Sequence, residues 1–371
     1  MCLNKPNLPF GGMNVIFAGD FAQLSPVIGG ENSALYSPAS GMYATGKKSQ
    51  DAALEKAVWH QVTTVVILRQ NMRQNMQSDD DNKLRTALSN MCYRACTSDD
   101  ITFLSTRVCG SSSSAPDITG SMYRNVSIIT GLNIHKDAYN RIGSDRFAQE
   151  TKQELVNFYS DDTISENAII TKHAKQKKVT ALSLQVQIEL WNAYPSMNNK
   201  HIPGKLSLCK ATELGITKGQ EATVYAWEEG IGSRGQKILE SLFVKLILPP
   251  SMICIPGLPE NVVPLLRTSS SITCVLQDDT KININRSQIE VMPNFAMTDY
   301  CSQGKTWPVN PVDLNNCLLS RSASCDGTLI LPDYTDRNEV AFDPKKIQGM
   351  CSGHLRQDCL ILFMVIHIMP L

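Results

Sequence analysis

The stretch that decides the fold is Asn14-Val-Ile-Phe-Ala-Gly-Asp-Phe-Ala-Gln-Leu-Ser-Pro-Val27. Residues 15–18 are short, apolar and β-prone, as in a parallel strand that is covered on both faces. Gly19 and Asp20 then break the strand, and Gln23 follows just past its end. Because ligands of open α/β sheets bind at the carboxyl ends of strands, this turn is a candidate ligand site. The alternative is a plain turn that closes a strand.

The whole string GDFAQLSPV, residues 19–27, is more specific than a strand and a turn. It resembles the third motif of the Pif-type superfamily-one DNA helicases, especially those carried by Helitron transposons. In that family the glutamine contacts the terminal phosphate of ATP and links it to the DNA groove. The resemblance therefore implies that Gln23 senses the nucleotide, with Gly19 and Asp20 beside it.

Further segments resemble motifs of the same family, in the order that the family requires. They are VVILRQNMRQ (65–74), IITGLNIHKDAYN (128–140), HIPGKLSLC (201–209) with ITKGQEATV (216–224), AMTDYCSQGKT (296–306) and LSRSAS (319–324). Together with the third motif they cover most of the chain. Such an ordered set argues against coincidence.

The resemblance assigns roles to residues in these segments. Phosphoryl transfer needs positive groups around the terminal phosphate, and the planar guanidinium suits this task. The implied catalytic residues are Gln23, Arg73 and Arg321; Gly19, Asp20, Gln74, Gln303 and Gly304 are implied at the nucleotide, and Thr298, Ser302 and Thr306 at DNA. Two alternatives stay open: Arg321 could cap a helix end, and Gln303-Gly304 could be an ordinary turn.

The family also has a phosphate loop, G-x-x-x-x-G-K-[ST], and an Asp-Glu pair that holds Mg²⁺. Both lie upstream of the third motif, so we expect an N-terminally truncated chain that does not hydrolyse ATP alone. ATP and Mg²⁺ are cofactors by resemblance, with the Mg²⁺ ligands absent. Residues 41–48 end in Lys where Mg²⁺ needs a hydroxyl, and residues 299–306 begin with Asp in place of Gly. Neither is therefore assigned as a phosphate loop.

The charge and cysteine content of the chain bear on its partners and its cellular location. The chain has 371 residues, with 35 Lys and Arg against 35 Asp and Glu, so no global field draws it to nucleic acid or a membrane. Twelve cysteines without a C-x-x-C pair, and no secretory leader, favour a reducing nuclear or cytosolic setting. We expect a nuclear location, with a mitochondrial one left open, and no secretion. Cys92 and Cys96 are expected to pack in a core, and no metal ligand is assigned. The apolar segment 359–371 is too short to span a bilayer. Its apolar composition is explained by a changed reading frame or a mispredicted gene end, or by a buried terminal strand.

We predict an α/β fold with two RecA-like parallel-sheet motor domains, the first one partial, and a small inserted β-barrel. Residues 1–60 would end the first motor domain, 61–205 and 292–350 would form the second, 206–291 the barrel, and 351–371 an atypical tail. Helices are expected near 52–60, 81–93 and 135–142, with a loosely amphipathic stretch at 147–159. Strands are expected at 13–18, 61–68, 223–227, 242–248, 271–276 and 281–285.

Two local features stand apart. The basic run from Lys172 to Lys178 could contact phosphates or could be a solvated face. After Lys210 the family has one more strand, whereas Ala211 follows at once here. We therefore expect that a core strand is lost.

The resemblance implies an ATP-dependent DNA helicase that unwinds from the five-prime end, in DNA repair, recombination, telomere maintenance or transposition. Its partners would be single-stranded DNA and duplex junctions, and no membrane. The competing hypothesis is a non-enzymatic, transposon-derived remnant that binds single-stranded DNA weakly at most.

Overall fold

The structure of the chain is a computed structural model, which describes residues 13, 15–20, 47–59, 64–68, 73–74, 78–92, 95–164, 169–172, 175–178, 181–217, 220–313, 319–334, 340–341 and 362–367. The chain divides into two compact units. Unit 1 comprises Met1–Ala115, Ser322–Asp326 and Pro332–Leu371, and unit 2 comprises Pro116–Arg321 and Gly327–Leu331. The domain limits drawn from the sequence at residues 60, 205, 291 and 350 stay predictions.

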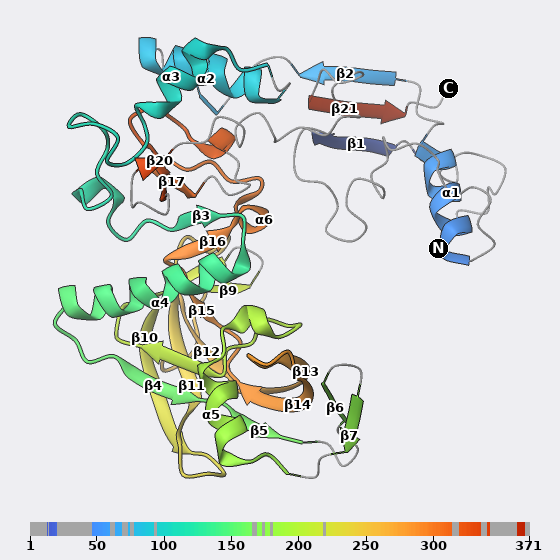
Figure 1. Cartoon of the computed structure of the whole chain (residues 1–371), viewed down its shortest axis with the longest axis vertical. Helices are drawn as coiled ribbons and strands as arrows, with labels where there is room; N and C mark the ends of the chain where they lie inside the picture. Colours follow the sequence, from blue (N-terminus) through green and yellow to red (C-terminus); the bar gives the residue numbers. More distant parts are fainter. Residues whose placement is uncertain are drawn as a thin grey trace. The chain divides into compact units, whose positions relative to one another are not determined.

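Unit 1 contains a three-stranded sheet in which β21 (Leu362–His367) lies between β1 (Val15–Asp20) and β2 (Thr64–Leu68) (Figure 1). Both pairings are antiparallel. The expectation that β1 is a central parallel strand is therefore wrong, because β1 is the outer strand of this sheet and runs against its neighbour. An apolar, β-prone composition predicts a strand but does not fix the direction of the strand beside it.

The helices of unit 1 are α1 (Lys47–Trp59), α2 (Asp79–Cys92) and α3 (Ser98–Ser105). The sequence predicted the first two. At the start of α3, the Thr97 hydroxyl accepts from the Asp100 N–H at 3.2 Å, and an Asp100 carboxylate oxygen accepts from the Thr97 N–H at 2.8 Å. This reciprocal capping box starts a helix that the sequence reasoning missed. Leu84 and Leu88 of α2 and Leu104 of α3 are buried in the core of unit 1.

Unit 2 contains a parallel sheet of four strands, in the order β16 (Ala296–Thr298), β3 (Ile128–Thr130), β17 (Asn310–Asp313) and β18 (Thr328–Leu331). The helix α4 (Asn133–Glu150) follows β3 and packs against this sheet (Figure 1). A Cβ at Gly143 would lie 2.4 Å from Cγ of Phe295, so glycine allows this close approach. The predicted α/β class with a parallel sheet is thus confirmed.

The rest of unit 2 is mainly β-structure, as predicted for residues 206–291. One sheet has the order β12-β11-β10-β9-β15, and another has the order β13-β14-β6-β7, with β5 also paired to β14. These two sheets are separate ladders, and a closed barrel stays a prediction. The strands are β5 (Asp161–Thr163), β6 (Ile169–Lys172), β7 (Lys175–Lys178), β9 (Glu213–Thr217), β10 (Gln220–Ile231), β11 (Lys237–Leu246), β12 (Val262–Leu266), β13 (Thr268–Val275), β14 (Lys281–Gln288) and β15 (Met292–Pro293).

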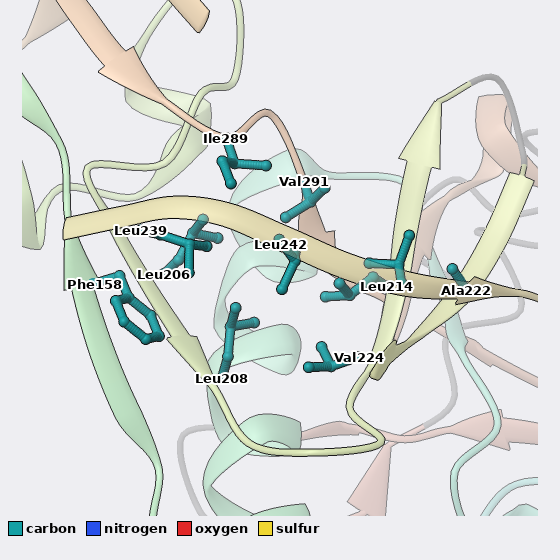
Figure 2. Packing of buried hydrophobic residues seen from close by; sticks show 11 residues of the cluster. Phe158, Leu206, Leu208, Leu214, Ala222, Val224, Leu239, Leu242, Ile289 and Val291 are labelled. Carbon is teal, nitrogen blue, oxygen red and sulfur yellow. The ribbon is translucent and has the colours of Figure 1, made fainter. Parts of the chain in front are cut away.

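A hydrophobic core joins the first of these sheets to the pair β4 (Val156–Tyr159) and β8 (Lys205–Leu208). Figure 2 shows Phe158 and Leu208 pointing into the same apolar cluster as Leu242 of β11. All three side chains are fully buried. The stretch 147–159, predicted as amphipathic, is divided here, because α4 ends at Glu150 and β4 begins at Val156.

A buried ion pair ties the second sheet to its surroundings. The guanidinium of Arg286 on β14 donates to both carboxylate oxygens of Asp162 on β5, each at 2.9 Å. It also donates to the carbonyl oxygens of Ile202 and Leu190, the latter in α5 (Leu184–Asn192). Through these bonds the Arg286 guanidinium links β14 to β5, to α5 and to the chain before β8.

A tight connection at residues 209–212 joins β8 to β9, and the loss of a core strand after Lys210 stays a prediction. Ala211 adopts a left-handed conformation with φ of 61°. The Thr212 hydroxyl donates to the Cys209 carbonyl at 2.7 Å, and the Ala211 N–H donates to the Val224 carbonyl at 2.9 Å. The chain therefore closes directly from β8 into β9 across residues 209–212.

Candidate functional site

Three neighbouring strands of the parallel sheet in unit 2 end in polar residues. Thr298 of β16 is in register with Thr130 of β3, and Val312 of β17 is in register with Ile129, so Asp313 ends β17 beside Thr130. The carboxyl ends of parallel strands meet at one edge, where α/β proteins bind ligands. We call the residues Thr130, Thr298–Thr306 and Asp313 the carboxyl edge.

A hydrogen-bond network organises the carboxyl edge. The Thr130 hydroxyl donates to Asp313 at 2.9 Å, and Nδ1 of His135 lies 3.1 Å from the same carboxylate oxygen. A carboxylate can accept but not donate, so both neighbours act as donors. His135 lies in the first turn of α4, and the network therefore fixes the start of this helix to two strand ends. The sequence reasoning assigned no role to these three side chains, although each polar residue follows an apolar strand or opens a helix.

The predicted DNA-binding hydroxyls of the carboxyl edge divide into two groups. Thr298 and Ser302 are buried and make local bonds: Thr298 donates to Sγ of Cys301 at 3.4 Å, and Ser302 donates to the Asp299 carbonyl at 2.8 Å. They close the short helix α6 (Asp299–Ser302). Thr306, by contrast, is exposed.

The turn after α6 presents the exposed part of the carboxyl edge. Gln303 and Gly304, both predicted at the nucleotide, are exposed, and Gly304 has a φ of 85° that favours glycine. Nζ of Lys305 lies 3.0 Å from Glu221 and 5.1 Å from the ring centre of Trp307. This turn therefore offers an exposed backbone that a phosphate group can approach closely, beside a lysine that is paired with Glu221.

Asp299 lies buried within the carboxyl edge. Its removal from water raises the pKa of the carboxyl to about 6, and the hydrogen bond from the Tyr300 N–H opposes this increase. Near neutral pH the carboxylate is therefore ionised at a cost in stability.

Arg321, predicted to contact the terminal phosphate, ends the short helix η5 (Leu319–Arg321) of unit 2. Its side chain is 1% exposed, and its carbonyl accepts from the Trp307 N–H at 2.9 Å. The turn 303–306 is thus joined through Trp307 to the sixth motif. The catalytic role of Arg321 stays a prediction.

The other predicted residues belong to unit 1. Gly19 and Asp20 end β1, and Gln23 lies outside the described residues. Arg73 is half-buried, whereas Gln74 is buried and donates from Nε2 to the Ser322 carbonyl at 2.8 Å. Gln74 therefore joins the fourth motif to Ser322 of the sixth motif. Nucleotide contact by these residues stays a prediction.

The described part of the chain holds neither a metal-ligating cluster nor a helix that could span a membrane. No group of three or more His, Cys, Asp or Glu side chains there could hold a metal ion. No step is assigned to a metal ion. Within the same residues, no helix has the length and apolar character needed to cross a bilayer.

The fold and the carboxyl edge define an α/β protein with a four-stranded parallel sheet. A family model described as PIF1-like helicase matches residues 2–94, the segment that includes the third and fourth motifs quoted from the sequence. No curated protein matches the chain.

Solved structures of two helicases are similar in outline. The Pif1 helicase from Candida albicans shares 18% identity, with a TM-score of 0.49, over 94% of this chain and 70% of that one. Bacteroides Pif1 bound to ssDNA shares 15% identity, with a TM-score of 0.48, over 93% of this chain and 65% of that one. The chain thus spans 70% and 65% of the lengths of these two proteins.

Proposed function

We propose that this chain is the nucleic-acid-binding portion of a Pif1-type ATP-dependent DNA helicase, which unwinds DNA from the five-prime end. The observation that carries the proposal is the PIF1-like helicase match over residues 2–94, the segment that holds the third and fourth motifs. The similar Bacteroides protein was solved with ssDNA, which supports single-stranded DNA as the partner, with duplex junctions as the second substrate.

The carboxyl edge supplies the binding surface in this proposal. Its exposed turn, residues 303–306, brings a glycine backbone and a lysine to the edge of the parallel sheet. Such groups contact the sugar-phosphate backbone without reading bases, so binding is insensitive to sequence and weakens with added salt.

Hydrolysis of ATP is not a property of the 371 residues alone in this proposal. They contain no G-x-x-x-x-G-K-[ST] segment. The same observation favours the second candidate, a transposon-derived remnant that binds single-stranded DNA without turnover. A nuclear location, with a mitochondrial one as the alternative, and roles in repair, recombination, telomere maintenance or transposition belong to the proposal for the helicase.

One preparation tests both parts. The purified chain is titrated into a labelled oligo-dT at low salt, and phosphate release from ATP is measured with and without that oligonucleotide. We expect salt-sensitive binding and no hydrolysis above a mock preparation. Undetectable binding by a folded chain would contradict the binding role, and DNA-stimulated hydrolysis abolished by Gln23→Ala would contradict the inactivity.

A further inference from the structure

The basic run of the sequence forms a two-stranded hairpin in unit 2. It consists of β6 and β7, whose basic residues are Lys172, Lys175, Lys177 and Lys178, and we call it the lysine hairpin. The sequence has no acidic residue between Glu166 and Glu189, although the chain as a whole has no net charge. The hairpin therefore concentrates positive charge in one short segment.

The register of the hairpin sets like charges against one another. Lys172 is the direct register partner of Lys175, and the other two lysines face Ile170 and Ile169. On the other side of β6, Thr171 is in register with Lys281 of β14. Like charges that lie directly opposite across a ladder destabilise a sheet. No strand partner of the hairpin supplies an acidic residue among these register pairs.

Acidic residues flank the hairpin in the neighbouring turn. Asp278 and Asp279 precede β14, and Asp278 accepts from the Thr280 N–H at 3.1 Å. These two acidic residues precede β14, and neither is a register partner of a residue in β6 or β7.

Protection of a sheet edge explains part of this pattern. β7 is the last strand of its sheet among the described residues, and lysines on edge strands prevent unwanted pairing with other chains. Lys172 lies on β6, whose pairing with β14 covers Ile170 and Thr171 and does not extend to Lys172. The register leaves the opposed Lys172–Lys175 pair facing no acidic residue across the ladder, so an anion that binds there would relieve the repulsion.

We propose that the lysine hairpin is a phosphate-binding arm for single-stranded nucleic acid, an inference that rests on the proposed function. Lysine ammonium groups are strongly hydrated point charges that contact phosphates without base specificity. Each contact releases condensed counterions, so the arm adds to affinity and to its salt dependence. A polyanion along the hairpin also neutralises the opposed lysines.

The test compares two quadruple variants of the full chain. The hairpin variant carries Lys172→Gln, Lys175→Gln, Lys177→Gln and Lys178→Gln. The control carries the same substitution at four exposed lysines elsewhere in unit 2: Lys152, Lys200, Lys210 and Lys245. Binding of oligo-dT is measured by anisotropy over a series of salt concentrations, and thermal unfolding shows that each variant is folded.

We expect the hairpin variant to bind about 10- to 100-fold more weakly at low salt, with its log K against log [salt] slope reduced by roughly 2 to 3, since each single-strand phosphate contact contributes about 0.7. The control variant should keep the parent slope to within about 0.7. Equal slopes for the two variants, or a loss confined to duplex probes, would overturn the proposal. If the parent chain itself does not bind oligo-dT, the proposed function fails instead.

Discussion

The sheet of unit 1 and the parallel sheet of unit 2 are both built from short apolar strands, yet their strand ends differ. In unit 1, Asp20 at the end of β1 is in register with Leu362 at the start of β21. In unit 2, Thr298, Thr130 and Asp313 end three adjacent strands at one edge. Parallel order, more than strand composition, therefore gathers polar groups into a candidate site.

The two regions also differ in what holds them. β21 pairs with a neighbour along both of its sides, so backbone hydrogen bonds join the sheet of unit 1. In unit 2, buried polar side chains link strands of the described sheets: Arg286 of β14 bonds to Asp162 of β5, and Thr130 of β3 bonds to Asp313 of β17. Substitutions that remove the side-chain bonds of unit 2, or the backbone pairing of unit 1, test how much each contributes to stability.

The largest effect is expected from the buried ion pair of unit 2. Arg286→Ala leaves the Asp162 carboxylate buried without its partner, and should lower the free energy of unfolding of unit 2 by about 3–5 kcal/mol. Urea unfolding followed by circular dichroism measures this change. The double variant Arg286→Met with Asp162→Leu should recover much of the loss, because it leaves no unpaired charge. A loss below about 1 kcal/mol in the single variant would show that the pair does not hold unit 2 together.

A smaller effect is expected from breaking the central strand of unit 1. Val365 pairs with Phe17 on one side and Val65 on the other. Val365→Pro removes an N–H from the ladder and should cost unit 1 about 1–3 kcal/mol, with the stability of unit 2 unchanged. Hydrogen exchange of the β1 and β2 amides reports the change, and Val365→Ile is the control that keeps the backbone donor. Unchanged protection in the proline variant would refute the central position of β21.

The smallest stability effect concerns Asp299, whose pKa is raised by burial to about 6. The folded state holds the proton more tightly than the unfolded state, so the stability from this group falls as pH rises from about 4 to 6 and stays low above. Asp299→Asn should remove that slope and stabilise unit 2 at pH 7 by about 1–2 kcal/mol. Thermal unfolding across pH 4–8 measures both effects. An identical pH slope in the two proteins would mean that Asp299 is not the titrating group.

Local elements followed from the sequence, and long-range pairings did not. The helix α2 and the strands β10, β11, β13 and β14 lie where periodicity and turn residues predicted them. The helix α3 was missed because its capping box uses Asp100 where Glu or Gln is usual. The direction of β21 and the closure of the chain at Ala211 depend on partners far along the chain, which composition does not specify.

In the candidate site, too, the sequence predicted local features and did not predict contacts between residues far apart in the chain. The motif resemblance identified the turn 303–306, whose exposed residues are in a position to contact a ligand. It did not identify His135 and Asp313, which are 178 residues apart in sequence and meet through strand order in the sheet. It also did not predict that Thr298, Ser302 and Gln74 would be engaged in local or packing hydrogen bonds.

The most direct test of the central claim, that the carboxyl edge of unit 2 binds single-stranded DNA, is a matched pair at Gly304. A Cβ there meets nothing within 4 Å, and Asp and Asn tolerate its left-handed conformation similarly. Gly304→Asp adds one negative charge to the exposed turn, whereas Gly304→Asn adds none. Measured by oligo-dT anisotropy at low salt, Gly304→Asp should bind about 10-fold more weakly than Gly304→Asn, which should stay close to the parent chain. Equal affinities of the two folded variants would contradict the claim that DNA contacts this edge.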